Sequence, residues 1–170
     1  MSKPLKVLFL CSGNTCRSPF ASALARLRLP EGGVEFASAG LRAVTGEPAS
    51  EGSLLVGAEL GLDLSAHRAR QASAELLAGV DWAIVMTRTQ AALLRRAFPD
   101  FPGRIGLLGL PGIDLTAEPE AAARGEEVGD PLGGDLSAYH RMAEQIDRLL
   151  AGWRTVFSAG AAPESERKAT

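Results

Sequence analysis

The stretch CSGNTCRS at residues 11–18 constrains the fold of this chain more than any other part of its sequence. It follows a short apolar run, residues 6–10, of the kind that forms a strand buried on both faces of a parallel sheet. Ser18 and Pro19 then have the character of a helix N-cap and first turn, because a serine hydroxyl can accept a free N–H and proline has no N–H to leave unbonded. A strand, a polar loop and a helix in this order predict the opening unit of an α/β domain.

The same alternation continues along the chain. Three more runs with strand character occupy residues 34–39, 81–86 and 104–108, the last of them interrupted by Gly106. Helical spacing and helix-stop signals mark residues 20–29, 48–60, 89–98 and 136–153. We therefore expect an α/β fold, a single doubly wound domain with a four-stranded parallel sheet flanked by helices on both faces. We assign residues 1–157 to this domain and expect the small, polar and charged residues 158–170 to form a disordered tail.

Composition narrows the functional classes. The 170 residues carry a net charge of -2 without a cluster of Lys and Arg, which argues against a nucleic-acid-binding surface. No apolar stretch is long enough to span a membrane. Cys11 and Cys16 are too few and too close together for a disulfide framework, and His67 and His140 are isolated, so we expect neither a secreted scaffold nor a zinc site. We expect a cytoplasmic monomer with reduced thiols and no metal or cofactor.

The loop has the residues of a phosphate cradle with a nucleophile. Backbone N–H groups of a tight loop and of a helix start both favour an anion, including the thiolate of Cys11, which is the nucleophilic form of cysteine. Arg17 stands at the helix start, where its planar fork can bind two phosphate oxygens. Gly13 tolerates unusual backbone angles, and Ser18 can donate a hydrogen bond to the sulfur. An inert Cys11 with a solvent-facing Arg17 is the alternative, but the combination predicts a cysteine-dependent phosphatase.

At these residues the chain resembles the low-molecular-weight protein-tyrosine phosphatase family. The family's signature near the amino terminus is Cys-x5-Arg-Ser/Thr, usually with Gly-Asn and Ser-Pro, as in residues 11–19 here. Further matches are the segment Ser38-Ala-Gly40, the segment GLDLSAHRARQ at residues 61–71 and the pair Asp130-Pro131. The resemblance extends over roughly residues 5–153.

The resemblance implies a mechanism that needs no metal. Cys11 would attack phosphorus to form a phosphocysteine, and Asp130 would protonate the leaving group and then activate water. Arg17 would hold phosphate oxygens, and Ser18 would stabilise the sulfur. The implied phosphate-binding residues are Ser12, Gly13, Asn14, Thr15, Cys16, Arg17 and Ser18, with Ser38 and His67 as supports of the loop. From the residues alone, Asp130 is equally a plain turn residue, although it is the only Asp in the chain that precedes a Pro.

Departures from the tyrosine-specific members bear on the substrate, a phosphorylated residue of a protein. Those members usually carry an aliphatic residue, often Ile, where this chain has Thr15, and aromatic residues around the pocket mouth. Here Leu132 follows Pro131, and residues 41–45 contain no aromatic that could stack on a phosphotyrosine ring. Thr15 together with Gly133-Gly134 looks like the bacterial protein-arginine phosphatases of the family. These features favour phosphoarginine over phosphotyrosine.

Two other functional classes are alternatives. Arsenate reductases of this fold pass a disulfide to a resolving cysteine well downstream, and residues 81–95 contain none. A non-catalytic phosphate-binding module would be expected to lack Cys11, Arg17 or Asp130, and all three are present. Cys16 has two interpretations: it shapes the loop, or, as in relatives with the same pair, it forms a reversible disulfide with Cys11 under oxidation.

Overall fold

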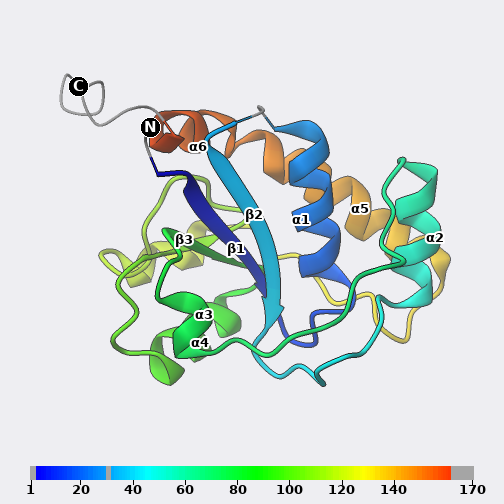
Figure 1. Ribbon diagram of the computed structural model, residues 1–170, viewed down its shortest axis with the longest axis horizontal. Coiled ribbons are helices and arrows are strands. Elements are labelled where there is room, and N and C mark those ends of the chain that lie inside the picture. The colour runs from blue at the N-terminus through cyan, green and yellow to red at the C-terminus, as the bar shows by residue number, and fades with distance from the viewer. Residues whose placement is uncertain (1–2, 30–31, 162–170) are drawn as a thin grey trace.

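A four-stranded parallel sheet forms the centre of the protein (Figure 1). The computed structural model describes residues 3–29 and 32–161. The sheet has the order β2-β1-β3-β4 and comprises β1 (Leu5–Cys11), β2 (Val34–Gly40), β3 (Trp82–Val85) and β4 (Arg104–Leu107). The predicted α/β fold with four parallel strands is therefore confirmed. Since β2 and β3 flank β1 on opposite sides, the carboxyl end of β1 lies at the switch point where ligands bind in such sheets.

Helices cover both faces of the sheet, as expected (Figure 1). One face is covered by α1 (Arg17–Arg28), α5 (Leu136–Ala151) and α6 (Arg154–Ala161), with α2 (Glu51–Glu59) packed against α5. The other is covered by α3 (Ala74–Leu77), α4 (Arg88–Ala97) and the 3-10 helix η1 (Pro119–Arg124). Alternate residues of β1 supply the two cores, Phe9 on the first face and Leu8 and Leu10 on the second. Within residues 3–29 and 32–161, no helix has the length and apolarity needed to cross a membrane.

Two helix starts differ from the sequence prediction. The N-cap of α1 is Cys16, whose side chain makes no capping bond, so the prediction of Ser18 as N-cap is wrong. The Ser18 hydroxyl is engaged elsewhere, 3.0 Å from Cys11 Sγ. Similarly, α2 begins at Glu51 rather than at Pro48, because Pro48 pairs with Arg68 in a short antiparallel bridge. In both cases a tertiary contact takes a residue that local sequence assigns to a helix.

The predicted helix over residues 136–153 forms but ends at Ala151, and a further helix that was not predicted follows it. Helix α5 ends at Ala151, and α6 continues from Arg154 to Ala161, four residues into the predicted tail; residues 162–170 lie outside the described part of the chain. Trp153 at the break is fully buried and donates its indole N–H to Leu108 O at 2.9 Å. Its ring lies over Gly106, where a Cβ would come within 2.6 Å of it. The glycine that interrupts β4 in the sequence therefore makes room for this tryptophan.

Candidate active site

The loop at residues 12–16 joins the end of β1 to the start of α1, at the carboxyl edge of the sheet. Neighbouring segments use its carbonyl groups: Arg42 N–H donates to Ser12 O at 2.8 Å, and Ser50 N–H donates to Thr15 O at 2.9 Å. Among the described residues, no backbone hydrogen bond has an N–H group of residues 12–16 as its donor. These N–H groups are therefore available to an anion, as in other loops that lead into a helix N-terminus.

Cys11 is buried where this loop begins, with 2% of its surface exposed. Its Sγ lies 3.0 Å from Ser18 Oγ. The Ser18 oxygen accepts a hydrogen bond from Asn14 Nδ2 at 2.8 Å, and the Ser18 hydroxyl proton can go either to Cys11 Sγ or to Ala39 O at 3.3 Å. A thiolate can only accept a hydrogen bond, so the Ser18 hydroxyl donates to the sulfur when Cys11 is ionised. The arrangement places a donor for the anionic sulfur next to it.

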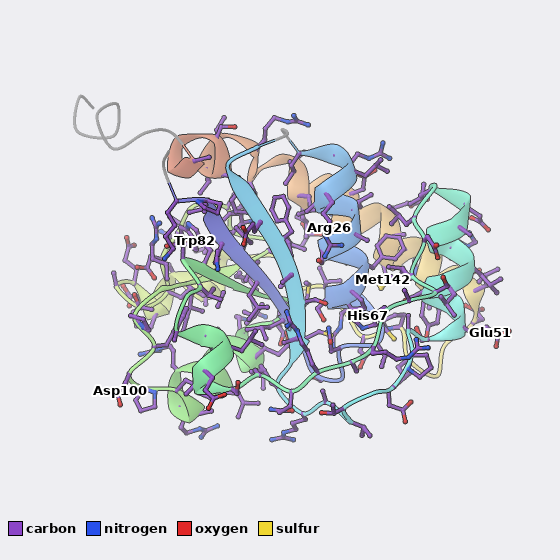
Figure 2. All side chains as sticks on the ribbon, in the orientation of Figure 1. Arg26, Glu51, His67, Trp82, Asp100 and Met142 are labelled. Carbon is purple, nitrogen blue, oxygen red and sulfur yellow. The ribbon has the colours of Figure 1, made fainter. Side chains whose placement is uncertain are left out.

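Asn14 is the centre of a buried network that shapes the loop. Its backbone has φ +56°, a left-handed conformation that asparagine tolerates better than most residues, and its side chain is fully buried. The side-chain amide donates to Ser38 Oγ at 3.0 Å as well as to Ser18, and Asn14 Oδ1 accepts Arg70 N–H at 3.0 Å. His67 Nε2 lies 2.7 Å from Asn14 O and must be the donor, because a carbonyl oxygen can only accept. Figure 2 shows His67 near the amino-terminal end of α1.

Arg17 connects the loop to a distant segment of the chain. It is 4% exposed, and its Nη1 donates to Val128 O at 3.0 Å. Its Nη2 lies 3.5 Å from Asp130 Oδ2, which brings the predicted acid next to the predicted phosphate ligand. Arg17 Nε is buried and has no hydrogen-bond partner among the described residues. A buried guanidinium with an unused donor beside a nucleophile is suited to receiving an anion.

Asp130 lies on an exposed turn, and its side chain is 47% exposed. Asp130 Oδ1 accepts the N–H of Leu132 at 3.1 Å, which orients the carboxylate while Oδ2 faces Arg17. A pocket of about 280 Å³ borders this side chain and is lined by Gly129, Asp130, Pro131, Ala138, Arg141, Met142 and Gln145. The carboxylate is therefore both close to the loop and open to solvent, as an acid that exchanges protons with substrate and water must be.

Cys16 and Thr15 differ from Cys11 in their surroundings. Cys16 is buried, and its Sγ donates to Ser50 Oγ at 3.1 Å and lies 3.7 Å from the hydroxyl of Tyr139. Burial, with smaller contributions that include Cys16, raises the pKa of Tyr139, so this hydroxyl stays protonated. Both cysteines are free thiols in this structure. Thr15 is partly exposed, and its Oγ1 lies 3.7 Å from Cys16 Sγ.

Two side chains that sequence analysis left without a role also support the loop. Arg70 Nε donates to Ser38 O at 2.9 Å, in addition to the bond from its backbone to Asn14. Gln90 of α4 donates from Nε2 to Ser12 Oγ at 3.3 Å. Arg70 belongs to the segment at residues 61–71 that resembles the family, so this resemblance could have indicated it. No local pattern marks Gln90, because its contact depends on the placement of α4 beside the loop.

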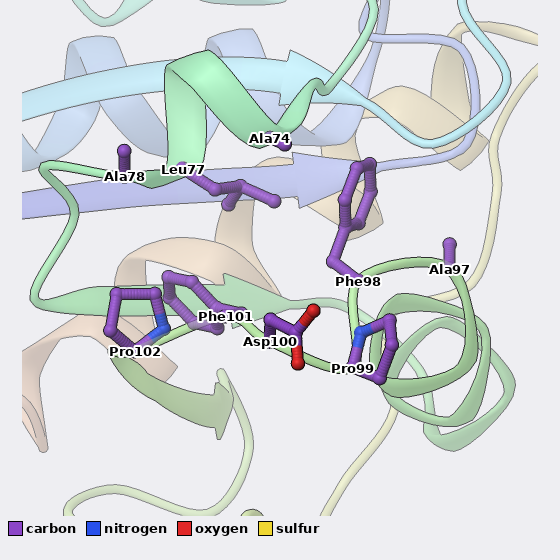
Figure 3. Close-up of a pocket in the computed structure, with 9 residues that line it drawn as sticks. All are labelled: Ala74, Leu77, Ala78, Ala97, Phe98, Pro99, Asp100, Phe101 and Pro102. Atoms are coloured by element: carbon purple, nitrogen blue, oxygen red, sulfur yellow. The ribbon is translucent and has the colours of Figure 1, made fainter.

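A second pocket, of about 290 Å³, lies between α3 and the end of α4 (Figure 3). Figure 3 shows Phe98 and Phe101 at this pocket, with Asp100 between them. Its lining is mostly apolar and contains no nucleophile: Ala74, Leu77, Ala78, Ala97, Phe98, Pro99, Asp100, Phe101 and Pro102. Since residues 99–102 lead into β4, they lie toward the amino end of the strands, whereas Cys11 is at the carboxyl end. The candidate active site is therefore the loop and not this pocket.

Comparison with known proteins gives one consistent answer. Residues 6–161 match the sequence profile of the family described as low molecular weight phosphotyrosine protein phosphatase. A probable low molecular weight protein-tyrosine-phosphatase, EpsP of Ralstonia nicotianae, is 35% identical over 147 residues, covering 86% of this chain and 92% of the relative. A protein-arginine-phosphatase of Geobacillus stearothermophilus is 32% identical over 151 residues, with 86% of this chain and 92% of the relative covered.

A solved structure supports the same similarity. The crystal structure of the Erwinia amylovora tyrosine phosphatase AmsI superposes with a TM-score of 0.75 at 28% identity, covering 91% of this chain and 94% of that protein. The match to the family profile, residues 6–161, includes the loop, its supporting segments and Asp130.

Proposed function

The chain belongs to the low molecular weight phosphotyrosine protein phosphatase family, and we propose that it hydrolyses phosphate from protein residues through a phosphocysteine at Cys11. The observation that carries the proposal is the buried Arg17 guanidinium. Its Nε has no partner among the described residues, and it lies at the end of a loop whose N–H groups are also unused by the backbone. The five loop N–H groups and the guanidinium of Arg17 are donors that suit a phosphate dianion. The thiol of Cys11, where the loop begins, is the nucleophile that would attack the bound phosphate.

In the first step, Cys11 Sγ forms a bond to phosphorus while the bond from phosphorus to the leaving oxygen or nitrogen breaks. Asp130 gives its proton to the leaving group, so a tyrosine departs as the neutral phenol and an arginine departs as the guanidinium. Arg17 and the loop N–H groups bind the three equatorial oxygens, where charge is spread in the transition state. Ser18, already 3.0 Å from the sulfur, stabilises Cys11 as a thiolate before attack.

In the second step, water attacks phosphorus and the S–P bond breaks. Asp130, now a carboxylate, takes the proton of the attacking water, and the products are inorganic phosphate and the Cys11 thiolate. Ser18 donates to the sulfur as it leaves, which lowers the cost of returning it to the anion. Asn14, Ser38 and His67 hold the loop in the shape that binds phosphate; they touch the loop rather than the reacting atoms.

Rapid-mixing kinetics with p-nitrophenyl phosphate test this proposal. Wild-type protein should release a burst of p-nitrophenol equal to the enzyme concentration, because the phosphocysteine accumulates, and Cys11→Ser should release none. Asp130→Asn should lower turnover by about 10²–10⁴-fold without abolishing it. The matched control is Asp100→Asn, an exposed loop carboxylate at the other edge of the sheet (Figure 2), which should leave turnover unchanged. Full activity in Cys11→Ser would refute the mechanism.

For the substrate, we propose phosphoarginine in preference to phosphotyrosine. Support comes from Thr15, whose hydroxyl sits in the loop, and from the exposed Leu132, which replaces an aromatic wall after Asp130-Pro131. A threonine leaves more room than isoleucine, and its hydroxyl can contact a phosphoguanidinium or orient water. The test is kcat/KM on phosphoarginine and phosphotyrosine peptides for wild type and Thr15→Ile. The ratio should move toward phosphotyrosine in the variant, and an unchanged ratio would contradict the role of Thr15.

The oxidoreductase alternative has less support. A disulfide relay needs a resolving cysteine beyond the loop, and Cys11 and Cys16 are the only cysteines of the chain. A burst of p-nitrophenol that disappears in Cys11→Ser separates the phosphatase from this alternative and from a non-catalytic phosphate-binding module.

A further inference from the structure

We propose that the first turn of α4 is a bracket that sets the distance between the acid Asp130 and the phosphate loop. Gln90 holds the loop, and Arg88 holds the segment that carries the acid. This inference rests on the proposed function, because it assigns positioning residues to the same reaction. Neither side chain is given a role by the sequence motifs.

Gln90 forms the arm of the bracket that reaches the loop. It is 5% exposed, and its Oε1 accepts the N–H of Met86 at 2.9 Å. Because a backbone N–H can only donate, the oxygen of the amide must face Met86, and Nε2 is left to donate to Ser12 Oγ at 3.3 Å. The Gln90 N–H in turn donates to the N-cap Thr87 at 3.2 Å. The amide therefore joins the end of β3 to the loop in one fixed orientation.

Glu127 and Arg88 form the other arm. The Arg88 backbone N–H donates to Glu127 Oε2 at 3.1 Å, and Arg88 Nη2 pairs with Glu127 Oε1. The carboxylate thus occupies a free N–H at the start of α4, where the helix dipole also favours a negative charge. Arg88 Nη1 adds a contact to Gly125 O at 3.4 Å. These contacts fasten residues 125–127 to α4.

The fastened segment leads directly to the acid. Val128, the next residue, is fully buried, its N–H donates to Met86 O at 2.9 Å, and its carbonyl accepts from Arg17. Within the same segment, Glu126 pairs with Arg148 of α5, which connects the segment to the helices on the other face of the sheet. Asp130 follows two residues after Val128, on the exposed turn. Arg17 at the start of α1 joins this segment to one end of the loop, and the first turn of α4 adds a second connection, from Glu127 through Arg88 and Gln90 to Ser12 at the other end.

The consequence is kinetic. A partly exposed ion pair shifts an equilibrium constant by up to about fivefold, so loss of the Glu127 contacts should lower the share of molecules with the acid in place, by at most that factor. Only reactions that need protonation of the leaving group feel this loss. Phenyl phosphate needs a proton because phenolate is a poor leaving group, whereas dinitrophenolate departs without one.

We would therefore measure kcat/KM for phenyl phosphate and for 2,4-dinitrophenyl phosphate. This constant reports the steps up to phosphocysteine formation and is independent of its hydrolysis. Glu127→Ala should lower kcat/KM for phenyl phosphate by up to about fivefold and should lower kcat/KM for the dinitrophenyl ester by a smaller factor. Glu127→Gln keeps one hydrogen-bond acceptor, so its kcat/KM for phenyl phosphate should fall less than that of Glu127→Ala. Gln90→Met should instead raise the inhibition constant of inorganic phosphate and lower both rates equally, because it loosens the loop and not the acid.

The matched control is Asp147→Asn, which removes the ion pair between Arg28 and Asp147. The two pairs are similarly exposed: 44% and 39% for Arg28 and Asp147, and 47% and 31% for Arg88 and Glu127. Asp147→Asn should change neither rate. Equal losses of Glu127→Ala on both esters, or no loss on either, would overturn the bracket. If wild type hydrolyses neither ester, the proposed function itself fails, and this outcome is distinct from the first two. Thermal melts of each variant show whether a lost rate reflects unfolding.

Discussion

Replacing Asn14 by alanine tests how strongly the buried network holds the phosphate loop. The substitution removes the amide donations to Ser18 and Ser38 and the bond that Arg70 N–H makes to Asn14 Oδ1. It keeps the carbonyl that His67 contacts, but it places alanine at φ +56°, where alanine is strained. The loop would then either change its conformation or keep a strained backbone that destabilises the folded protein.

The expected cost follows from these contacts. Three neutral hydrogen bonds contribute about 1 kcal/mol each, which gives about 3 kcal/mol. The left-handed backbone adds about 1 kcal/mol for alanine, so the free energy of unfolding should fall by about 4 kcal/mol. A domain has about 5–15 kcal/mol in total, so the variant should still fold. For a chain of this length the melting temperature should fall by about 8–16 °C.

Urea unfolding followed by circular dichroism measures this loss. Asn14→Gly is the control, because it lacks the same side-chain bonds but adopts positive φ freely, and it should be up to about 1 kcal/mol less destabilised than Asn14→Ala. Both variants should lose most of their phosphatase activity, since the loop shape is lost in both. A fall of less than about 1 kcal/mol in the free energy of unfolding of Asn14→Ala would refute the reasoning, because the three hydrogen bonds would then contribute little to stability.

Two further predictions concern the close approach of Gly40 to the loop and the pH dependence of the pair formed by His140 and Glu59. Gly40→Ala should lower kcat/KM, because a Cβ at Gly40 would lie 2.7 Å from Ser12 O in the loop. Gly79→Ala is the control and should leave kcat/KM unchanged, because a Cβ there would meet nothing within 4 Å. Equal activity in the two variants would contradict this prediction. The hydrogen bond that the His140 Nε2–H donates to Glu59 raises the pKa of His140, so the pair stabilises the fold below the unfolded value of about 6.5 and loses this contribution as pH rises through the raised pKa. The difference in melting temperature between wild type and His140→Gln should therefore be larger at about pH 5.5 than at about pH 8.5, and a difference that grows with pH would be inconsistent with it.

The elements of the fold follow closely from local sequence. Apolar runs and helix signals predict all four strands and the helices α1, α2, α4 and α5, because burial and periodicity are properties of neighbouring residues. The errors lie where a distant contact competes with a local preference. Trp153 leaves the predicted long helix because Gly106 of β4 makes room for its ring and Leu108 O accepts its indole N–H.

Candidate residues were predictable to different degrees. Cys11, Arg17 and Ser18 lie within one short stretch, residues 11–18, so their spacing alone indicates a phosphate site with a nucleophile. From local sequence Asp130 is equally a turn residue, because the proline that follows it is the only feature that distinguishes it from other acids, and the family resemblance is what points to it. Its proximity to Arg17, 3.5 Å between Nη2 and Oδ2, depends on how residues 125–130 cross the end of the sheet.

The sequence by itself determined which chemical groups the loop carries, since a strand, a short polar loop and a helix place N–H groups, a thiol and a guanidinium within eight consecutive residues, 11–18. Only the tertiary structure decided how that loop is held and where the acid stands. Asn14 is fixed by Ser38 and His67, and the acid segment is fixed to the start of α4, through contacts between residues far apart along the chain. Such contacts exist only once the sheet has assembled, which is why no local pattern reveals them.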